Sequence, residues 1–187
     1  MKNKLNNNEK GFALPLVLLL LVVMTIMGTT LITITSGEHK ANTDIDTNQQ
    51  IFYAAESGIS VAKKYMVDNT SKFNSSQSNL DGSLKFCKAS FFPNLRTANG
   101  FHFDKKSLNE VISTSGEEAI RLGKFSFEYF IAYSPDQNGY NSSAKKKSGT
   151  NNTLYTIYSC GCNETKDKCS SQSNIIVPLE VVVTLVN

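Results

Sequence analysis

An uncharged stretch near the amino terminus constrains this chain more than any other feature. No Asp, Glu, Lys or Arg lies between Gly11 and Gly37, and residues 12–34 are apolar apart from threonines and one glycine. As a helix these residues extend about 35 Å, enough to cross the hydrocarbon core of a bilayer, which is about 30 Å thick. Three lysines precede the stretch, and basic residues before a span favour a cytoplasmic amino terminus. We therefore predict one membrane span, with the rest of the chain exported.

Three other interpretations compete for this stretch. A secretory signal peptide has a shorter apolar region of about 7–15 residues, followed by an Ala-x-Ala cleavage site, and no such pattern follows Thr29. A buried core helix would need partner surface on every side, more than a domain of this size provides. A plain single-span anchor of a periplasmic protein remains open.

Composition argues against several function classes. The 187 residues suffice for one modest domain. Lys and Arg number 19 against 16 Asp and Glu, and without the first ten residues the balance is 16 against 15, so the total charge gives no case for nucleic-acid binding. The chain has no Gly-rich phosphate loop and no Gly-x-Ser-x-Gly motif. We expect no catalytic residues, no cofactor and no metal site, and we assign His39 to the surface and His102 to a half-buried structural role.

The junction before the apolar stretch is informative. A polar leader ends in Glu9-Lys10-Gly11 and runs directly into Phe12-Ala13-Leu14-Pro15-Leu16. This junction resembles the class III signal of type IV prepilins. The resemblance implies that prepilin peptidase cleaves between Gly11 and Phe12 on the cytoplasmic face, that the new amino group of Phe12 is methylated, and that the apolar helix is kept.

One residue departs from the common pilin pattern. Most pilins and pseudopilins carry a glutamate as the fifth mature residue, and this chain has Leu16 there. A carboxylate at that depth is costly in lipid unless it pairs with a neighbouring subunit's amino terminus, and Leu16 has no charge to pair. The apolar residue is similar to the K-type pseudopilins and the PilX-type minor pilins, which cap or prime an assembly.

Helical apolar spacing continues beyond the span, from Asn42 to Met66. One predicted face is apolar and the opposite face is polar, which is typical of an amphipathic helix laid on a globular head. The apolar face comprises Ile45, Phe52, Ala55, Ile59, Ala62 and Met66, and the polar face Asp44, Asn48, Gln49, Glu56, Ser60, Lys63 and Lys64.

Within this helix, Phe52-Tyr53-Ala54-Ala55-Glu56-Ser57-Gly58-Ile59 resembles the aromatic, Ala-Ala-Glu, small, Gly motif of PilX-type minor pilins. The resemblance implies a role in shaft packing and assembly for Phe52, Ala54, Ala55, Glu56 and Gly58. Small residues also allow close packing on a sheet, and both interpretations can hold. Threonines and Gly28 lower helix propensity in the second half of the span, so local unwinding on assembly is a further hypothesis.

The remainder predicts a head of α+β class, in which an antiparallel sheet packs on the helix. Polar residues 68–83 predict a loop, and Ser107 and Ser115 each begin a capping-box pattern before a short helical turn. Pro178 lies near a strand start, which suits an edge strand. The expected strands cover Leu84–Phe86, Phe101–Phe103, Phe125–Tyr133 with its odd-numbered aromatic and apolar residues on one face, Thr153–Cys160 and Ile175–Val186. The domain division is a leader at 1–11, a membrane helix at 12–34, its amphipathic half at 35–67 and a globular head at 68–187.

Four cysteines, an even set, fit disulfide bonding in an oxidising periplasm. Cys160 and Cys162 lie on the same face of one strand, so a bond between them is geometrically poor, and two pairings remain. We favour Cys162 with Cys169 and Cys87 with Cys160 over the alternative in which these partners are exchanged. A zinc site formed by the four thiolates is disfavoured by their spacing.

The loop 134–152 contains Asp136-Gln137-Asn138-Gly139 and Lys145-Lys146-Lys147. A calcium loop would need further carboxylates at fixed offsets, so we expect a solvated loop. The lysines fit a surface charge run better than a DNA-binding patch.

Taken together, the chain resembles a PilX-type minor pilin of a type IV pilus (fimbrium). The resemblance implies an inner-membrane subunit with a periplasmic head that later reaches the pilus tip. Its implied partners are other minor and major pilins, prepilin peptidase, the inner-membrane assembly platform and inner-membrane lipid, without nucleic acid. Two alternatives are a K-type pseudopilin of type II secretion and a tip subunit for adhesion or DNA uptake, in which case DNA would be a partner.

Overall fold

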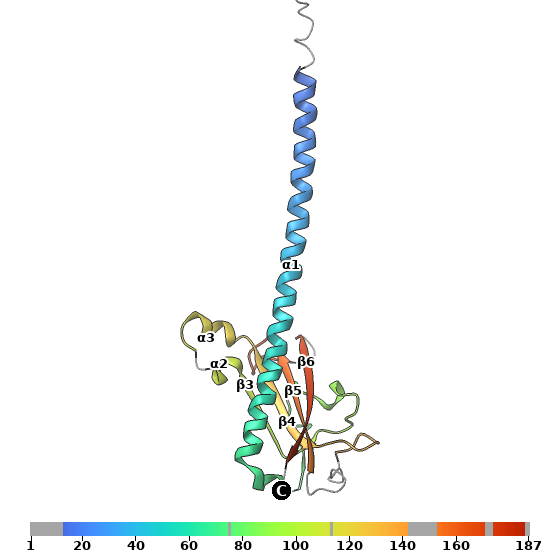
Figure 1. Cartoon of the computed structure of the whole chain (residues 1–187), viewed down its shortest axis with the longest axis vertical. Coiled ribbons are helices and arrows are strands. Elements are labelled where there is room, and N and C mark those ends of the chain that lie inside the picture. Colours follow the sequence, from blue (N-terminus) through green and yellow to red (C-terminus); the bar gives the residue numbers. More distant parts are fainter. Residues whose placement is uncertain (1–12, 75, 113, 142–152, 171–173, 186–187) are drawn as a thin grey trace, which may run out of the picture. The chain divides into compact units, whose positions relative to one another are not determined.

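The computed structural model describes residues 13–74, 76–112, 114–141, 153–170 and 174–185. The chain forms two compact units that divide after Ile45, and the helix α1, Ala13–Asp68, has residues in both (Figure 1). The fold is α+β, as predicted: a long amino-terminal helix followed by a head whose antiparallel sheet packs on the second half of that helix. The predicted membrane half and amphipathic half, which meet at residue 34, both belong to this one helix.

In the first unit, α1 is long and apolar enough to cross a membrane. Every large apolar side chain from Leu14 to Ile34 is exposed in the isolated chain. Its threonine hydroxyls donate hydrogen bonds back to helix carbonyls three residues earlier, at 2.8–2.9 Å for Thr25, Thr29, Thr30 and Thr33. These bonds satisfy the hydroxyls within the helix, which suits a surrounding without water.

In the second unit, four strands form a sheet in the order β3-β4-β5-β6, in which each strand is antiparallel to the next. The strands are β3 His102–Ser107, β4 Ser126–Tyr133, β5 Thr153–Cys162 and β6 Ile176–Leu185. The last three agree closely with the predicted strands, and β6 is an edge strand, as Pro178 suggested. A separate two-stranded ladder pairs β1, Ser78–Asn79, with β2, Asn99–Gly100.

Some local predictions were wrong. Leu84–Phe86 is not a strand, because the N–H of Leu84 bonds to the Leu80 carbonyl and those of Lys85 and Phe86 bond to a side chain instead of to a neighbouring strand. Residues 68–83, predicted as a loop, include a 3-10 helix, Thr70–Asn74, and the short strand β1. The short helices α2, Leu108–Val111, and α3, Glu117–Leu122, form where expected, yet neither has a side-chain cap bond, so the capping boxes are not made.

Both faces of the two central strands, β4 and β5, are buried. On one face, Phe127, Tyr129 and Ile131 of β4 pack with α1. On the other, Phe130 and Tyr158 lie beneath the segment 80–98, which contributes Leu80, Leu84, Phe86, Phe92 and Leu95. The prediction for β4 accounted for only the first face, because an alternating aromatic pattern reveals one buried side and not what covers the other.

Candidate functional site on helix α1

The buried stripe of α1 differs in part from the predicted one. Ala55, Ile59, Ala62 and Met66 are buried as expected, and the predicted polar face is exposed throughout. Ile45 and Phe52, placed on the apolar face by their spacing, are exposed. Their places against the sheet are taken by Ile51, Ala54 and Gly58.

The small residues of the motif let the helix approach β5 very closely. A Cβ added to Gly58 would clash with the Ser159 hydroxyl and lie 2.9 Å from the Phe127 ring. A Cβ added to Gly161 of β5 would clash with the Ile51 carbonyl and lie 2.9 Å from the Ala55 nitrogen. At Gly161 the main chain of β5 therefore meets the main chain of α1, and Gly58 leaves room for the side chains of Ser159 and Phe127. The packing interpretation of the small residues is confirmed.

A hydrogen bond reinforces this contact. The Ser159 hydroxyl on β5 donates to the Ala55 carbonyl at 2.8 Å, between two fully buried residues. Further along α1, the Tyr65 ring stacks on His102 of β3 with 3.7 Å between ring centroids. Burial lowers the pKa of His102, Lys72 and Lys106 act in the same direction, and Asp104 opposes them.

The other members of the motif face outward. Phe52 is 44% exposed, Tyr53 is 58% exposed, and Glu56 is exposed. A hollow of about 240 Å³ is lined by Tyr53, Glu56, Ser57 and Ser60 of α1 with Val111 of α2. The motif thus divides into Ala54, Ala55 and Gly58, which fix the helix to the head, and an outward group that the head does not cover.

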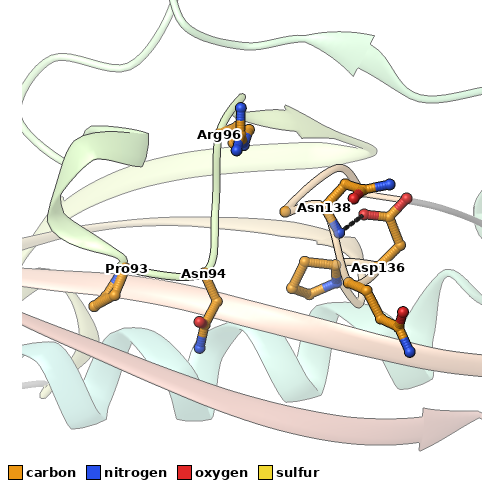
Figure 2. A pocket seen from close by; sticks show the side chains of 8 residues that line it. Pro93, Asn94, Arg96, Asp136 and Asn138 are labelled. Atoms are coloured by element: carbon orange, nitrogen blue, oxygen red, sulfur yellow. Dashed lines mark hydrogen bonds between the residues drawn. The ribbon is translucent and has the colours of Figure 1, made fainter.

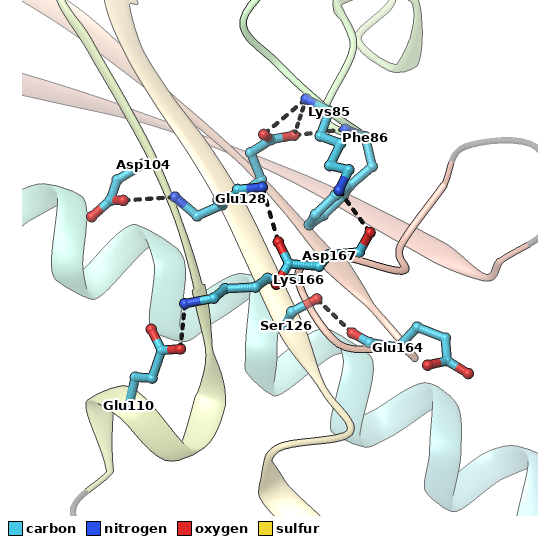
Figure 3. Close-up of polar contacts among 10 residues, drawn as sticks. Lys85, Phe86, Asp104, Glu110, Ser126, Glu128, Glu164, Lys166 and Asp167 are labelled. Atoms are coloured by element: carbon cyan, nitrogen blue, oxygen red, sulfur yellow. Dashed lines mark hydrogen bonds and ion pairs between the residues drawn. The ribbon is translucent and has the colours of Figure 1, made fainter.

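The favoured disulfide pairing is confirmed. Cys87 bonds Cys160 and Cys162 bonds Cys169, so all four cysteines are paired. Cys87 belongs to the segment 80–98 and Cys160 to β5, so the first bond joins this covering segment to the sheet. The second disulfide closes a short loop before β6. The Ser126 hydroxyl on β4 donates a hydrogen bond to the main-chain carbonyl of Glu164 in that loop (Figure 3).

Sequence reasoning missed Glu128, a fully buried acid on β4. Its carboxylate accepts N–H bonds from three successive residues, Lys85, Phe86 and Cys87, at 2.7–3.0 Å. Figure 3 shows the bonds from Lys85 and Phe86. An acid within the aromatic strand Phe127-Glu128-Tyr129-Phe130 was the available indication, because a buried acid needs donors. Glu128 explains why 84–86 is held as a loop.

The loop containing Asp136 folds as a hydrogen-bonded turn. Asp136 Oδ1 accepts the N–H groups of Asn138 and Tyr140, and the turn borders a hollow of about 350 Å³ that it shares with Asn94 and Arg96 (Figure 2). Gly139 has a φ of +82°, which favours glycine at this position. The three lysines at 145–147 lie outside the described residues.

The remaining predicted site residues lie at the start of the chain, on α1 and on β3. Gly11 and Phe12 lie outside the described residues, and Leu16 is 52% exposed on α1. His39 is exposed and His102 is half-buried, in agreement with prediction. No protein family, no curated protein and no solved structure matches this chain.

Proposed function

We propose that this protein is a minor pilin of the PilX type, which primes or caps a type IV pilus. One observation supports the proposal most, the combination of two features in a single helix. An uncharged stretch of α1 is long enough to cross a bilayer, and the small residues of its Ala-Ala-Glu-x-Gly motif pack on the antiparallel sheet of the head. The junction at Gly11 and Phe12, with lysines before it, supports processing by prepilin peptidase on the cytoplasmic side of the inner membrane.

The span serves two surroundings in this proposal. Its exposed apolar side chains suit lipid while the subunit waits in the inner membrane with its head in the periplasm. The same side chains suit contact with the helices of sibling subunits once the assembly platform extracts the subunit. Since the threonine hydroxyls already bond within α1, neither surrounding has to supply partners for them.

Leu16 sets the position of the subunit in the fibre. A carboxylate at the fifth mature position would pair with the amino terminus of the adjacent subunit. Leu16 has no charge, so a subunit carrying it suits the outermost position, where no further subunit requires that pair. The tip of the pilus is therefore the place that this residue favours.

The outward part of the motif is the assembly surface that we propose for the head. Phe52 and Tyr53 present exposed rings, 6.1 Å between centroids, and Tyr53 lines the hollow next to Val111. Exposed aromatic residues next to a hollow are typical anchors for a protein partner. Other minor and major pilins are the partners expected there.

The first test is the mass of the mature amino terminus of the protein purified from membranes. We expect the chain to begin at Phe12 with a methylated amino group, and we expect a Gly11→Val variant to keep its leader, because a bulky residue blocks the cleavage position. A wild-type chain that still begins at Met1, or that begins beyond residue 34, contradicts the proposal.

The second test counts surface fibres. Deletion of the gene should reduce fibre number, and a Phe52→Ala, Tyr53→Ala chain should restore fewer fibres than wild type at equal membrane abundance. The matched control is Lys63→Ala, Lys64→Ala, which removes two exposed side chains from the same helix and should restore them fully. Normal fibre number in the deletion strain would leave a plain membrane anchor as the better explanation.

A further inference from the structure

Glu128 and the disulfide Cys87–Cys160 form one arrangement on the face of the sheet that lies away from α1. Glu128 of β4 and Cys160 of β5 are cross-strand partners, so their side chains are adjacent on one face. The Glu128 carboxylate accepts the N–H of Cys87 at 2.7 Å. The same carboxylate therefore lies beside one cysteine and binds the main chain of the other.

Cys160 has a close competitor. Cys162 is two residues further along β5 and pairs with Ser126 of β4. Its side chain points to the same face as that of Cys160, about 7 Å away. A shift of the segment 80–98 by that distance would present Cys87 to Cys162 and leave Cys160 for Cys169.

The entropy of loop closure hardly distinguishes the observed disulfide pairing from the alternative. The observed bonds join residues separated by 73 and 7 positions, and both loops of the alternative are two residues longer. Since the entropy of loop closure depends on the logarithm of loop length, it favours the observed pairing by a factor of only about 1.5. A specific contact has to supply the rest of the preference.

Glu128 supplies that contact. We propose that Glu128 selects the partner of Cys87 during oxidation of the head: its carboxylate binds the N–H groups of Lys85, Phe86 and Cys87 in the reduced chain and so presents the Cys87 thiol to Cys160. Hydrogen bonds to an ionised acceptor are stronger than neutral ones, and Glu128 is fully buried, where the effect of such bonds is greatest. Glu128 is a positioning residue and does not itself react.

The covalent step is ordinary thiol–disulfide exchange, and its balance is complete. With glutathione disulfide as the oxidant, the Cys87 and Cys160 thiols lose two protons and two electrons in total and form one S–S bond, while the oxidant is reduced to two glutathione thiols. A mixed disulfide between glutathione and one of the two cysteines is the intermediate. The inference depends on the described head alone and not on the proposed function.

The test follows disulfide pairing in the full chain. Wild type and Glu128→Gln are reduced and unfolded, returned to folding conditions in detergent micelles with a glutathione redox buffer, quenched with iodoacetamide, and mapped by mass spectrometry of unreduced peptides. We expect the ratio of Cys87–Cys162 to Cys87–Cys160 to rise at least tenfold in Glu128→Gln. The matched control is Glu180→Gln on β6, an exposed acid on the same face, which should pair as wild type does. Wild-type pairing in Glu128→Gln would overturn the proposal.

Two further variants separate partner selection from general loss of folding. The first variant adds Glu128→Gln to a chain that lacks Cys162 and Cys169. The effective concentration of Cys87 toward Cys160, measured against glutathione, should fall at least tenfold. An unchanged effective concentration contradicts the proposal. Moving the acid in a Glu128→Gln, Ser126→Glu chain places it opposite Cys162. We expect this chain to form mainly Cys87–Cys162, and predominance of Cys87–Cys160 would contradict the selection mechanism.

Discussion

Two parts of one helix have opposite relations to the rest of the protein. Between Leu14 and Ile34, α1 has large apolar side chains and buries none of them. Between Ile51 and Met66 it has small residues among its apolar ones and buries a continuous stripe against the sheet. Among the described residues, the first part therefore has no surface of its own chain to bury its apolar side chains against, whereas the second part packs on the sheet of the head. Apolar character alone therefore does not indicate where a helix packs, since the close contact with the sheet also requires small residues such as Ala54, Ala55 and Gly58.

A charge placed between Leu14 and Ile34 of α1 should have the strongest effect of the changes proposed for this helix. Val23→Lys places a charge near the middle of the span, which disfavours membrane insertion by about 3 kcal/mol on insertion scales. We expect most of the variant in the alkali-extractable fraction of membranes, whereas Val23→Leu should stay in the pellet. Full retention of Val23→Lys would show that this part of α1 does not lie in the bilayer.

A larger side chain at Gly58, in the part of α1 that packs on the sheet, should have the next strongest effect. Gly58→Leu forces a side chain between α1 and β5, where a single added carbon already lies 2.9 Å from the Phe127 ring, and should destabilise the head by about 2–3 kcal/mol. The control is Gly37→Ala, whose added carbon meets nothing within 4 Å and should cost no stability. Urea unfolding of the full chain in micelles measures both, and equal midpoints would contradict the close contact.

Removal of the hydrogen bond that joins β5 to α1 should have a weaker effect. Ser159→Ala removes the donor to the Ala55 carbonyl and should cost about 1 kcal/mol in the same urea experiment. Ser57→Ala removes a hydroxyl that bonds only to its own helix, at Tyr53, and should cost nothing, because alanine favours helix. A loss in Ser57→Ala as large as that in Ser159→Ala would show that the cross-element bond has no special value.

The smallest effect concerns pH at the end of the packed part, where Tyr65 stacks on His102. Burial lowers the pKa of His102 in the folded head, so below pH about 6.5 the unfolded chain binds more protons than the folded one. The head should therefore lose stability as the pH falls through 6.5, and the loss should level off below the folded pKa. Thermal unfolding at pH 7.5 and 5.5 measures this, and His102→Gln should show a smaller difference; an equal difference would assign the effect to other groups.

The helix and the strands of the sheet could be predicted from the sequence, because periodicity reports them directly. The apolar stripe was only partly right: Ile45 and Phe52 are large and regularly spaced but exposed, while Ala54 and Gly58 are small and central to the contact. Spacing weighted by hydrophobicity favours large residues, whereas a helix that approaches a strand closely selects small ones.

The covering segment could not be predicted for a different reason. Leu84–Phe86 has the alternation of a strand, and the N–H groups of Lys85 and Phe86 bond to Glu128, more than 40 residues later in the chain. No local pattern reports a partner at that separation, so the segment was assigned to the wrong class. The disulfide pairing was predicted correctly, yet the acid beside it was missed, because cysteines are recognised by type and a buried acid only by its surroundings.

The contact of Gly58 with β5, and of Gly161 with α1, has a consequence for how such a head can diverge. At Gly161 the spacing between helix and strand is set by two backbones, which every sequence shares, and at Gly58 by the side chains of Ser159 and Phe127. Loops, charges and even the disulfide segment can change around it while this crossing keeps its dimensions. The outer surface of the head can therefore vary without altering this crossing of helix and strand.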